Sequence, residues 1–547
     1  MSRTVFRGAR LLDAELAGLA PGTATIVVEG GRLARITAET GQEASVGTTT
    51  SDPADAVIDL AGQVVVPGFV DSHVHLVWMG QSLASVALTD APDLATIQQR
   101  LRAERERLGP DAVLLRGKGW LFDALDTEPT AAMIDEVVAD IPVYLDSNDM
   151  HSVWVNSAAL RAMGVDAETP DPPSGRLSRL PSGEPAGMLY ERAAHEIGWA
   201  HLAATTTDRD RVEAVRRALE AFAAAGVTSV VDMGMDEDGW TALQTLARES
   251  AGRLPVRVVA HWLIADTGRS ASNLAAVERA AARATQGSEW LRVIGVKLVL
   301  DGVIDSCTAA LRYPYADGTN AELMWDLDRL DDVVLAADRA RLRLAIHAIG
   351  DRASDVALDV LERMVATNDP WDRRPRLEHL EIVSDDTPAR MAALGVTASI
   401  QPVHADPAIQ PNWRAQLGDE RVERGYPWPV FGAAGARVAL GTDAPTAPHE
   451  ALVNLHIATT RESVIDPALP ANTPGSVLPI DQALRHATVD SAASYAADDQ
   501  VGRLDPGFAA DFAVLADDPT ARGALLGNLV ELTVVGGEIV HRRSQSS

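Results

Sequence analysis

Cysteine is almost absent from this sequence, with Cys307 as the single instance among 547 residues. One thiol excludes an internal disulfide framework and a zinc cluster built from thiolates. A bound metal ion would therefore be held by nitrogen and oxygen atoms. The composition is compatible with a reducing compartment, and we expect a cytoplasmic protein.

Positive charge is also scarce, because 77 acidic residues outnumber 48 lysines and arginines and leave a net charge of -29. Such a charge repels the phosphates of nucleic acids and the surface of anionic membranes. We therefore expect no nucleic acid and no membrane among the partners, and a small-molecule substrate instead.

Long uncharged apolar runs are missing as well. No stretch of about 20 apolar residues occurs, which excludes a membrane-spanning helix. The first ten residues lack the apolar core of about 7–15 residues that a secretory signal contains, so we expect no export.

The two ends of the chain carry similar hairpin patterns. Residues 24–36 form two β-prone runs across Gly30-Gly31, and residues 532–540 repeat the pattern across Gly536-Gly537. Isolated hairpins are marginally stable, so both ends are expected to pack together, with 507–515 as a returning strand. We predict a small β-sandwich formed by residues 1–63 together with 500–547.

Between the ends, buried-strand runs alternate with helical stretches such as 351–366 and 384–394, which indicates parallel strands with crossover helices. This pattern predicts an α/β protein with a (β/α)8 barrel in residues 64–499. An interval of about 80–210 is too long for a loop and is expected to be an inserted subdomain with strands at 111–117 and 142–146. The eight candidate barrel strands are 64–72, 227–233, 256–262, 293–299, 342–347, 375–379, 396–401 and 437–442.

Six potential metal ligands end these runs. His73 and His75 lie two positions apart, so on a strand their imidazoles point to one side. The others stand at the carboxyl ends of later runs, where the active site of a (β/α)8 barrel is placed. The six candidates are His73, His75, Lys297, His347, His379 and Asp443.

Four of these six residues also have a structural alternative. Asp443 precedes Ala444-Pro445, a pattern typical of a helix N-cap. Lys297 is alternatively a surface or ion-paired lysine, and His347 and His379 are alternatively core histidines with satisfied hydrogen bonds.

The motifs around these residues resemble one family. The order His-x-His, Lys, His, His, Asp is that of the amidohydrolase superfamily. The segments 67–75, 297–302, 347–351 and 441–445 look like its amidohydrolase 3 branch, which includes YtcJ-like and N-substituted formamide deformylase-like proteins. The likeness covers nearly the whole chain.

The resemblance implies a centre with two divalent metal ions, usually zinc. His73, His75 and Asp443 would hold one ion and His347 and His379 the other. Lys297 would be N6-carboxylated by carbon dioxide, because a carbamate bridges two cations whereas an ammonium repels them. Asp443, Lys297 and His379 are then the catalytic candidates. Asp443 would take a proton from the bridging hydroxide and pass it to the leaving amine.

Substrate contacts are expected from loops at the barrel mouth and from the insertion. The candidates are His151 in the insertion, Asp305 after the fourth strand, Arg352 after the fifth and His404 after the seventh. The loop that contains Asp305 departs from the pattern that relatives tend to have after the fourth strand. The substrate preference of the family is therefore not carried over to this chain.

The resemblance implies hydrolysis of a non-peptide C–N bond in an amide, formamide, carbamate or cyclic amide. The same fold with a different bond, in an ester, a lactone or a ring to be deaminated, is an alternative. A non-catalytic scaffold is another. A symmetric homodimer is the expected assembly.

Overall fold

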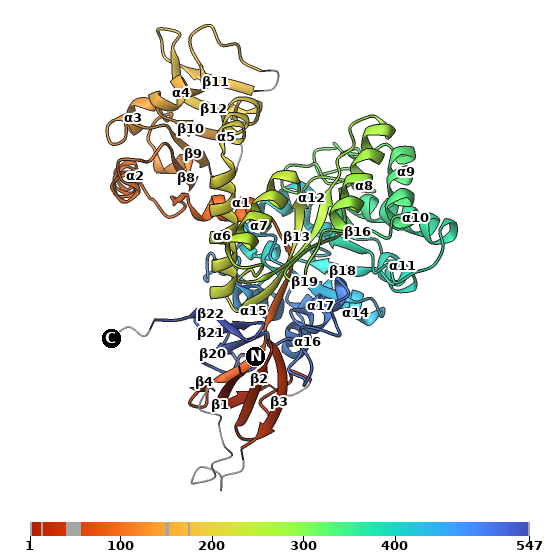
Figure 1. Ribbon diagram of the computed structural model, residues 1–547. Coiled ribbons are helices and arrows are strands. Elements are labelled where there is room, and N and C mark those ends of the chain that lie inside the picture. Colours follow the sequence, from red (N-terminus) through yellow and green to blue (C-terminus); the bar gives the residue numbers. More distant parts are fainter. Residues whose placement is uncertain (1–2, 13–14, 40–55, 148–151, 173–174, 545–547) are drawn as a thin grey trace. The chain divides into compact units, whose positions relative to one another are not determined.

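The computed structural model describes residues 3–12, 15–39, 56–147, 152–172 and 175–544. The chain divides into two compact units, Met1–Leu76 with Ala218–Ser547, and Val77–Arg217. The first unit contains a parallel barrel and a sheet made from both chain ends, and the second contains a mixed sheet with its own helices (Figure 1). In the described part of the chain, none of the helices combines the length and the apolar character needed to cross a membrane.

The barrel has eight parallel strands in the described residues, which confirms the predicted fold. Each strand pairs with the next one along the chain. The ring closes where Val74 bridges Ala444 in parallel and the Asp443 N–H donates to the His73 carbonyl at 2.7 Å. The strands are β6 (Phe69–Val74), β13 (Val227–Met235), β14 (Arg257–Leu263), β15 (Leu291–Val299), β16 (Arg343–Ala348), β17 (Arg376–His379), β18 (Thr397–Ile400) and β19 (Val438–Leu440).

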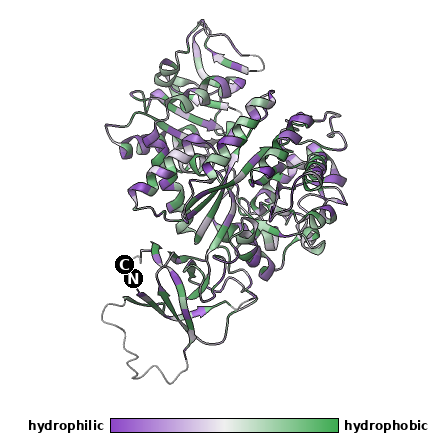
Figure 2. Ribbon diagram, turned by 45° about the vertical axis from the view of Figure 1, so that its right-hand side comes forward, coloured by the Kyte–Doolittle hydropathy of each residue, from purple (hydrophilic) through white to green (hydrophobic). Residues whose placement is uncertain are grey.

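Helices follow most of the strands, and their sequences alternate hydrophobic and hydrophilic positions (Figure 2). In α10 the buried residues recur every three or four positions, as an amphipathic helix on a sheet requires. The helices of this unit are α7 (Glu237–Glu249), α8 (Ser270–Ala284), α9 (Leu327–Arg339), α10 (Asp351–Thr367), α11 (Thr387–Leu394), α12 (Gln410–Leu417), α13 (Asp419–Val422), α14 (Trp428–Ala433), α15 (Ala451–Thr460), α16 (Ile480–His486) and α17 (Val489–Ser494), and α6 (Asp208–Ala224) leads into β13.

The prediction of one strand over 64–72 is wrong, because the run is divided at Gly68. Residues Val64–Pro67 form β5, which pairs with the terminal strands, and only β6 belongs to the barrel. A Cβ at Gly68 would lie 2.2 Å from the Thr228 side chain, so the chain crosses between sheets where only glycine fits. A continuous apolar run carries no sign of this change of sheet.

Both ends of the chain meet in one sheet with the order β22-β21-β20-β5-β1-β2-β3, and β4 lies beside β1. Its core includes Phe6 and Phe512, whose rings meet edge to face with centroids 5.1 Å apart. The strands are β1 (Arg3–Leu11), β2 (Ala24–Glu29), β3 (Arg32–Ala38), β4 (Ala56–Asp59), β5, β20 (Phe512–Leu515), β21 (Val530–Val535) and β22 (Glu538–Arg542).

The second unit is built on a mixed sheet with the order β11-β12-β10-β9-β8-β7. The strand expected at 111–117 begins later, at Leu115, because Val113 is 82% exposed and lies outside the sheet. The strands are β7 (Val86–Ala87), β8 (Leu115–Trp120), β9 (Val143–Ser147), β10 (Ser152–Val155), β11 (Gly175–Arg179) and β12 (Pro185–Glu191), and the helices are α1 (Leu76–Leu83), α2 (Leu94–Leu108), α3 (Ala131–Asp135), α4 (Ser157–Met163) and α5 (Ala200–Thr205).

Candidate metal centre

The barrel places four histidines and one aspartate together at the carboxyl ends of its strands. The imidazole centroids are 5.6 Å apart for His73 and His75, 4.9 Å for His73 and His379, and 4.4 Å for His347 and His379. Asp443, just after β19, brings its Oδ1 to 3.3 Å from His73 Nε2 and 3.1 Å from His75 Nε2. Residues from four strands thus converge on one point.

Lys297 belongs to β15 and is buried, with 2% of its surface exposed. Burial lowers the pKa of its amine, although Glu378 and Asp443 act in the opposite direction. In the described part of the chain Lys297 forms no ion pair, so the ion-paired alternative is wrong. A buried amine with a lowered pKa favours the neutral form, which is the form that reacts with carbon dioxide.

Three polar atoms of this cluster are buried without a hydrogen-bond partner among the described residues: His73 Nε2, His379 Nδ1 and Asp443 Oδ1. Leaving such an atom unpaired costs about 1–3 kcal/mol, so an arrangement of three needs an explanation. The ligand atoms of His73, His75 and Asp443 lie within 4.8 Å of one another. Two imidazoles and a carboxylate at this spacing fit a divalent ion such as zinc.

Burial keeps the imidazoles of His73, His347 and His379 neutral. It lowers the pKa of His73 to about 4 and that of His347 to about 3, and Lys297 adds to both shifts. The pKa of His379 is also well below its usual value, again because of burial. Burial opposes ionisation of Asp443, but His73 and His75 outweigh it and hold the carboxyl pKa well below its usual range. Neutral imidazole and ionised carboxylate are the forms that bind metals.

The backbone around the cluster is strained. Asp443 has a φ of 59°, His379 of 77° and Leu380 of 52°, although none of them is glycine. Such conformations cost about 1–3 kcal/mol each and persist where the surrounding structure enforces them. The next helix after Asp443 in the described chain is α15, with Glu450 as its N-cap, so the N-cap alternative for Asp443 is wrong.

A second contact orients the His347 ring. His347 Nε2 lies 3.2 Å from the Gly302 carbonyl, which directs its other nitrogen away from that loop. Asp301 holds the same loop by accepting from the N–H groups of Ile349 and Gly350 at 3.0 and 2.8 Å. The core-histidine alternative therefore accounts for one nitrogen of His347 and leaves His379 Nδ1 unexplained.

A buried ion pair that sequence reasoning missed supports His73. His73 Nδ1 lies 2.7 Å from Glu378 Oε2, and Arg376 Nε donates to Glu378 Oε1 at 2.6 Å. Arg376 also donates to the Ser72 carbonyl at 2.7 Å and to Ser399 Oγ at 2.6 Å. The carboxylate places the His73 proton on Nδ1, which leaves Nε2 as the ligand atom. In the sequence, this ion pair was indicated by two charged residues, Arg376 and Glu378, at alternate positions of a predicted strand.

We expect Glu378→Gln to weaken metal binding by about 10–100-fold, because the amide no longer fixes the tautomer and basicity of His73. Chelator competition on the purified variant measures this change. The thermal transition of the apo form serves as the control for misfolding. Unaltered metal affinity in a folded Glu378→Gln protein would show that the contact has no part in the site.

The predicted substrate contacts have different surroundings. Arg352 lies in the first turn of α10 and pairs with Glu322 at 3.1 Å. Asp305 accepts from Asn412 Nδ2 at 2.8 Å and from Trp413 Nε1 at 3.4 Å. His404 lies next to Asp443 and Glu381. His151 lies outside the described residues.

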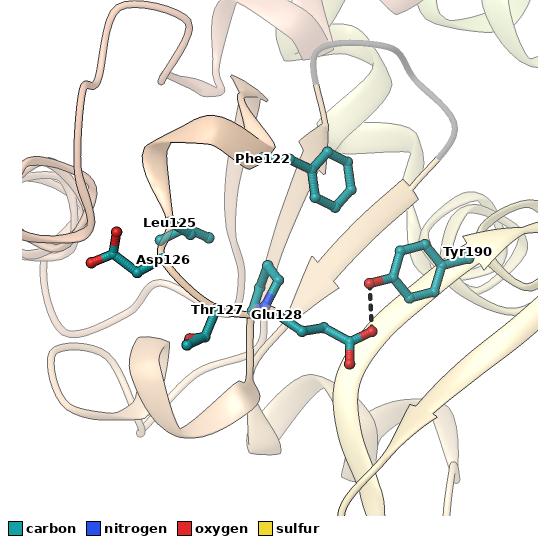
Figure 3. Close-up of a pocket in the computed structure, with 7 residues that line it drawn as sticks. Phe122, Leu125, Asp126, Thr127, Glu128 and Tyr190 are labelled. Atoms are coloured by element: carbon teal, nitrogen blue, oxygen red, sulfur yellow. Dashed lines mark hydrogen bonds between the residues drawn. The ribbon is translucent and has the colours of Figure 1, made fainter.

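The second unit has an open hollow of its own, with a volume of about 390 Å³. Its lining includes Phe122, Glu128 and Tyr190, and the Tyr190 hydroxyl donates to Glu128 Oε1 at 2.7 Å (Figure 3). Arg176 pairs with the same carboxylate oxygen at 3.1 Å and lies over the Tyr190 ring. Glu128, Tyr190 and Arg176 thus satisfy one another, in contrast to the polar groups of the barrel cluster.

Known proteins resemble this chain in sequence or in fold. The chain is 32% identical over 510 residues to Protein LONG AFTER FAR-RED 3 of Arabidopsis thaliana, covering 90% of this chain and 84% of that protein. It is 28% identical to N-substituted formamide deformylase of Arthrobacter pascens, covering 95% of each. An uncharacterized metal-dependent hydrolase from Pyrococcus horikoshii superposes with a TM-score of 0.77 at 27% identity, over 95% of this chain and 98% of that one.

The family assignment rests on nearly the whole chain. The model of the amidohydrolase family matches residues 56–541, which include the barrel, the insertion and every residue of the cluster. The resemblance found in the motifs around His73, Lys297, His347 and Asp443 is therefore confirmed. This chain belongs to the amidohydrolase family.

Proposed function

We propose that this protein is a metal-dependent hydrolase that cleaves a non-peptide C–N bond in a small molecule. The bond would belong to an amide, formamide, carbamate or cyclic amide. The 28% identity to N-substituted formamide deformylase over 95% of both chains supports this class of bond.

One observation carries the proposal: His73 Nε2, His379 Nδ1 and Asp443 Oδ1 are buried without a hydrogen-bond partner among the described residues. Asp443 Oδ1 has two ligand imidazoles as ionisable partners, with His73 Nε2 at 3.3 Å and His75 Nε2 at 3.1 Å. Buried polar atoms without a hydrogen-bond partner are explained when a bound ion or ligand supplies the missing interaction. Imidazole nitrogen and carboxylate oxygen are ligand atoms that suit zinc. A scaffold without catalysis has no need of these unpaired groups.

The proposed ligands fall into two sets joined by one residue. His73, His75 and Asp443 would hold one divalent ion, His347 and His379 the other, and N6-carboxylated Lys297 would join the two sets. When bound, such ions act as a Lewis acid and lower the pKa of water towards neutrality.

Asp443 would move the proton. Its carboxylate remains ionised in the buried site, so it is able to accept a proton from the attacking water. The same oxygen would then deliver the proton to the nitrogen of the leaving amine, which leaves poorly without it. This dual role suits cleavage of a C–N bond better than that of an ester, whose leaving group needs less protonation.

A substrate screen with metal content measured on the same sample tests the proposal. The panel contains N-acyl, N-formyl and carbamate compounds, with matched esters and lactones that differ only in the leaving atom. We expect turnover of at least one C–N compound that stops when the metal is removed and returns when zinc is added.

The matched pairs also separate the alternatives. Turnover of esters or lactones alone would replace the proposed C–N bond with a C–O bond on the same centre. Turnover that persists in fully metal-free protein would overturn the metal-dependent mechanism.

A further inference from the structure

His404 differs from the histidines of the candidate metal centre because both of its ring nitrogens face acceptors. Its Nδ1 lies 3.3 Å from Glu381 Oε1. Its Nε2 lies 3.3 Å from Thr446 Oγ1 and 3.5 Å from Asp443 Oδ2. His73 and His379, by contrast, each keep one buried nitrogen without a partner among the described residues. His404 is thus equipped to orient its neighbours.

The hydroxyl of Thr446 sets the direction of this contact. Thr446 Oγ1 donates its proton to the Asp443 carbonyl at 2.6 Å, so it is left as an acceptor towards His404. The Nε2 of His404 therefore presents an N–H to Thr446 and to the carboxylate oxygen beside it.

A network behind the pair fixes its position. The Tyr426 N–H donates to the Glu381 carbonyl at 2.8 Å, and the Tyr426 hydroxyl donates to the His404 carbonyl at 2.7 Å. The Tyr426 ring stacks on Trp413 with centroids 4.6 Å apart. The fully buried Arg461 donates to the Tyr426 carbonyl. One tyrosine thus holds the backbone of both members of the pair.

The two carboxylate oxygens of Asp443 face different partners. Oδ1 lies 3.3 Å from His73 Nε2 and 3.1 Å from His75 Nε2, and Oδ2 lies 3.5 Å from His404 Nε2. Rotation of this carboxylate would exchange the oxygen that faces the ligand histidines with the one that faces His404.

We propose that Glu381 and His404 form a positioning pair, in which Glu381 orients the imidazole and His404 holds the outer oxygen of Asp443. The inner oxygen is then kept directed at His73 and His75. This inference rests on the proposed function of Asp443, and it gives His404 a role other than the substrate contact expected from the sequence.

A metal site made of His379, Glu381 and His404 is the competing interpretation, because their ligand atoms lie within 4.8 Å of one another. The geometry favours the positioning pair, since Glu381 is already directed at His404 Nδ1 and the remaining nitrogen of His404 is directed at Asp443 and Thr446. Ligands of one ion would direct their lone pairs at a shared point instead.

The test compares His404→Ala with the wild-type protein in metal content, kcat and KM. We expect unchanged metal content, a kcat lower by about 100-fold, and a KM altered by less than about threefold, because a misdirected Asp443 slows the reaction without removing a substrate contact. Added imidazole is expected to restore part of kcat by entering the space of the missing ring.

Two further variants sharpen the comparison. Glu381→Gln keeps an oxygen acceptor and is expected to lower kcat by less than His404→Ala does. If His404→Ala fails to fold, the kcat of Glu381→Gln still tests the pair. His486→Ala removes another histidine–carboxylate pair, formed with Asp490 at 2.8 Å on α16 and α17, and is expected to leave kcat at the wild-type value.

A spectroscopic measurement tests the positioning pair independently of the proposed function. In cobalt-substituted protein the visible absorption reports on the carboxylate at the ion and needs no substrate. We expect His404→Ala to alter this spectrum at unchanged cobalt stoichiometry.

Each contrary result is specific. Loss of metal in His404→Ala and Glu381→Gln would make the pair ligands. A raised KM with wild-type kcat would make His404 a substrate contact, and an unaltered spectrum with full activity would remove the pair from the site. The proposed function fails on different grounds, if wild-type protein turns over no C–N substrate.

Discussion

Replacing Asp443 with asparagine is expected to lower kcat by about 10²–10⁴-fold while the protein stays folded. The asparagine amide has nearly the same shape as the carboxylate, but it cannot accept the proton that attack by water releases. The expected loss therefore falls on kcat, with little change in KM. Steady-state kinetics on the metal-loaded variant measures it, with circular dichroism as the folding control.

Asp385→Asn is the matched control for Asp443→Asn. Asp385 is exposed and pairs with Arg424 on the surface, so the same change of charge there is expected to leave kcat unaltered. If Asp443→Asn kept most of the wild-type kcat, Asp443 would have no part in proton transfer.

Lys297→Ala is expected to lose bound metal and with it all measurable turnover. Alanine offers no amine for carbon dioxide, so neither a carbamate nor any other bridging anion remains on β15. Metal analysis and activity are measured on the same preparation. Acetate or propionate is expected to restore part of both, because a short carboxylate fits the space of the deleted side chain and supplies the missing oxygens.

The sequence provides an internal control for this prediction, because Lys118 and Lys297 are its only two lysines. Lys118 contacts Ser82 Oγ in the second unit and is expected to tolerate alanine with metal content unchanged. Failure of every short carboxylate to restore metal, together with an unmodified amine at Lys297 in metal-loaded protein, would contradict the bridging role.

Most of the barrel was predictable because parallel strands covered by helices are apolar throughout. Runs such as 293–299 and 342–347 therefore stand out from the amphipathic helices between them. The break at Gly68 was not predictable, since β5 and β6 are equally apolar and belong to different sheets. What ends the first strand is the close approach of Thr228, which comes about 160 residues later.

The six candidate ligands were selected from the sequence because each ends a strand-like run, and the ends of barrel strands meet at one face. Their supporting residues were missed for the opposite reason. Arg376 and Glu378 are charged residues inside a strand, and their role depends on Ser72 and Ser399 from other strands. Such contacts between distant segments carry no local sequence pattern.

The rarity of lysine in this chain supports a special role for Lys297, and the search for strands and their ends did not take it into account. A chain with 48 basic residues uses arginine nearly everywhere, yet keeps a lysine at position 297, where it is buried. Arginine cannot be deprotonated in a protein and so cannot form the carbamate, whereas a buried lysine can. The choice of residue at this position thus agrees with the proposed bridge.

The substrate contacts expected from the loops stay predictions. In the structure Asp305 and Arg352 pair with protein groups, and His404 faces Asp443. Loop conformation depends on the particular residues that each loop meets, which spacing does not reveal.

Metal content of the purified wild-type protein tests the central claim most directly. The proposed centre predicts about two equivalents of divalent metal per chain, bound tightly enough to survive dialysis and removed together with activity by a chelator. Protein that binds none, and that gains neither metal nor activity when zinc or manganese is added with bicarbonate, would contradict it.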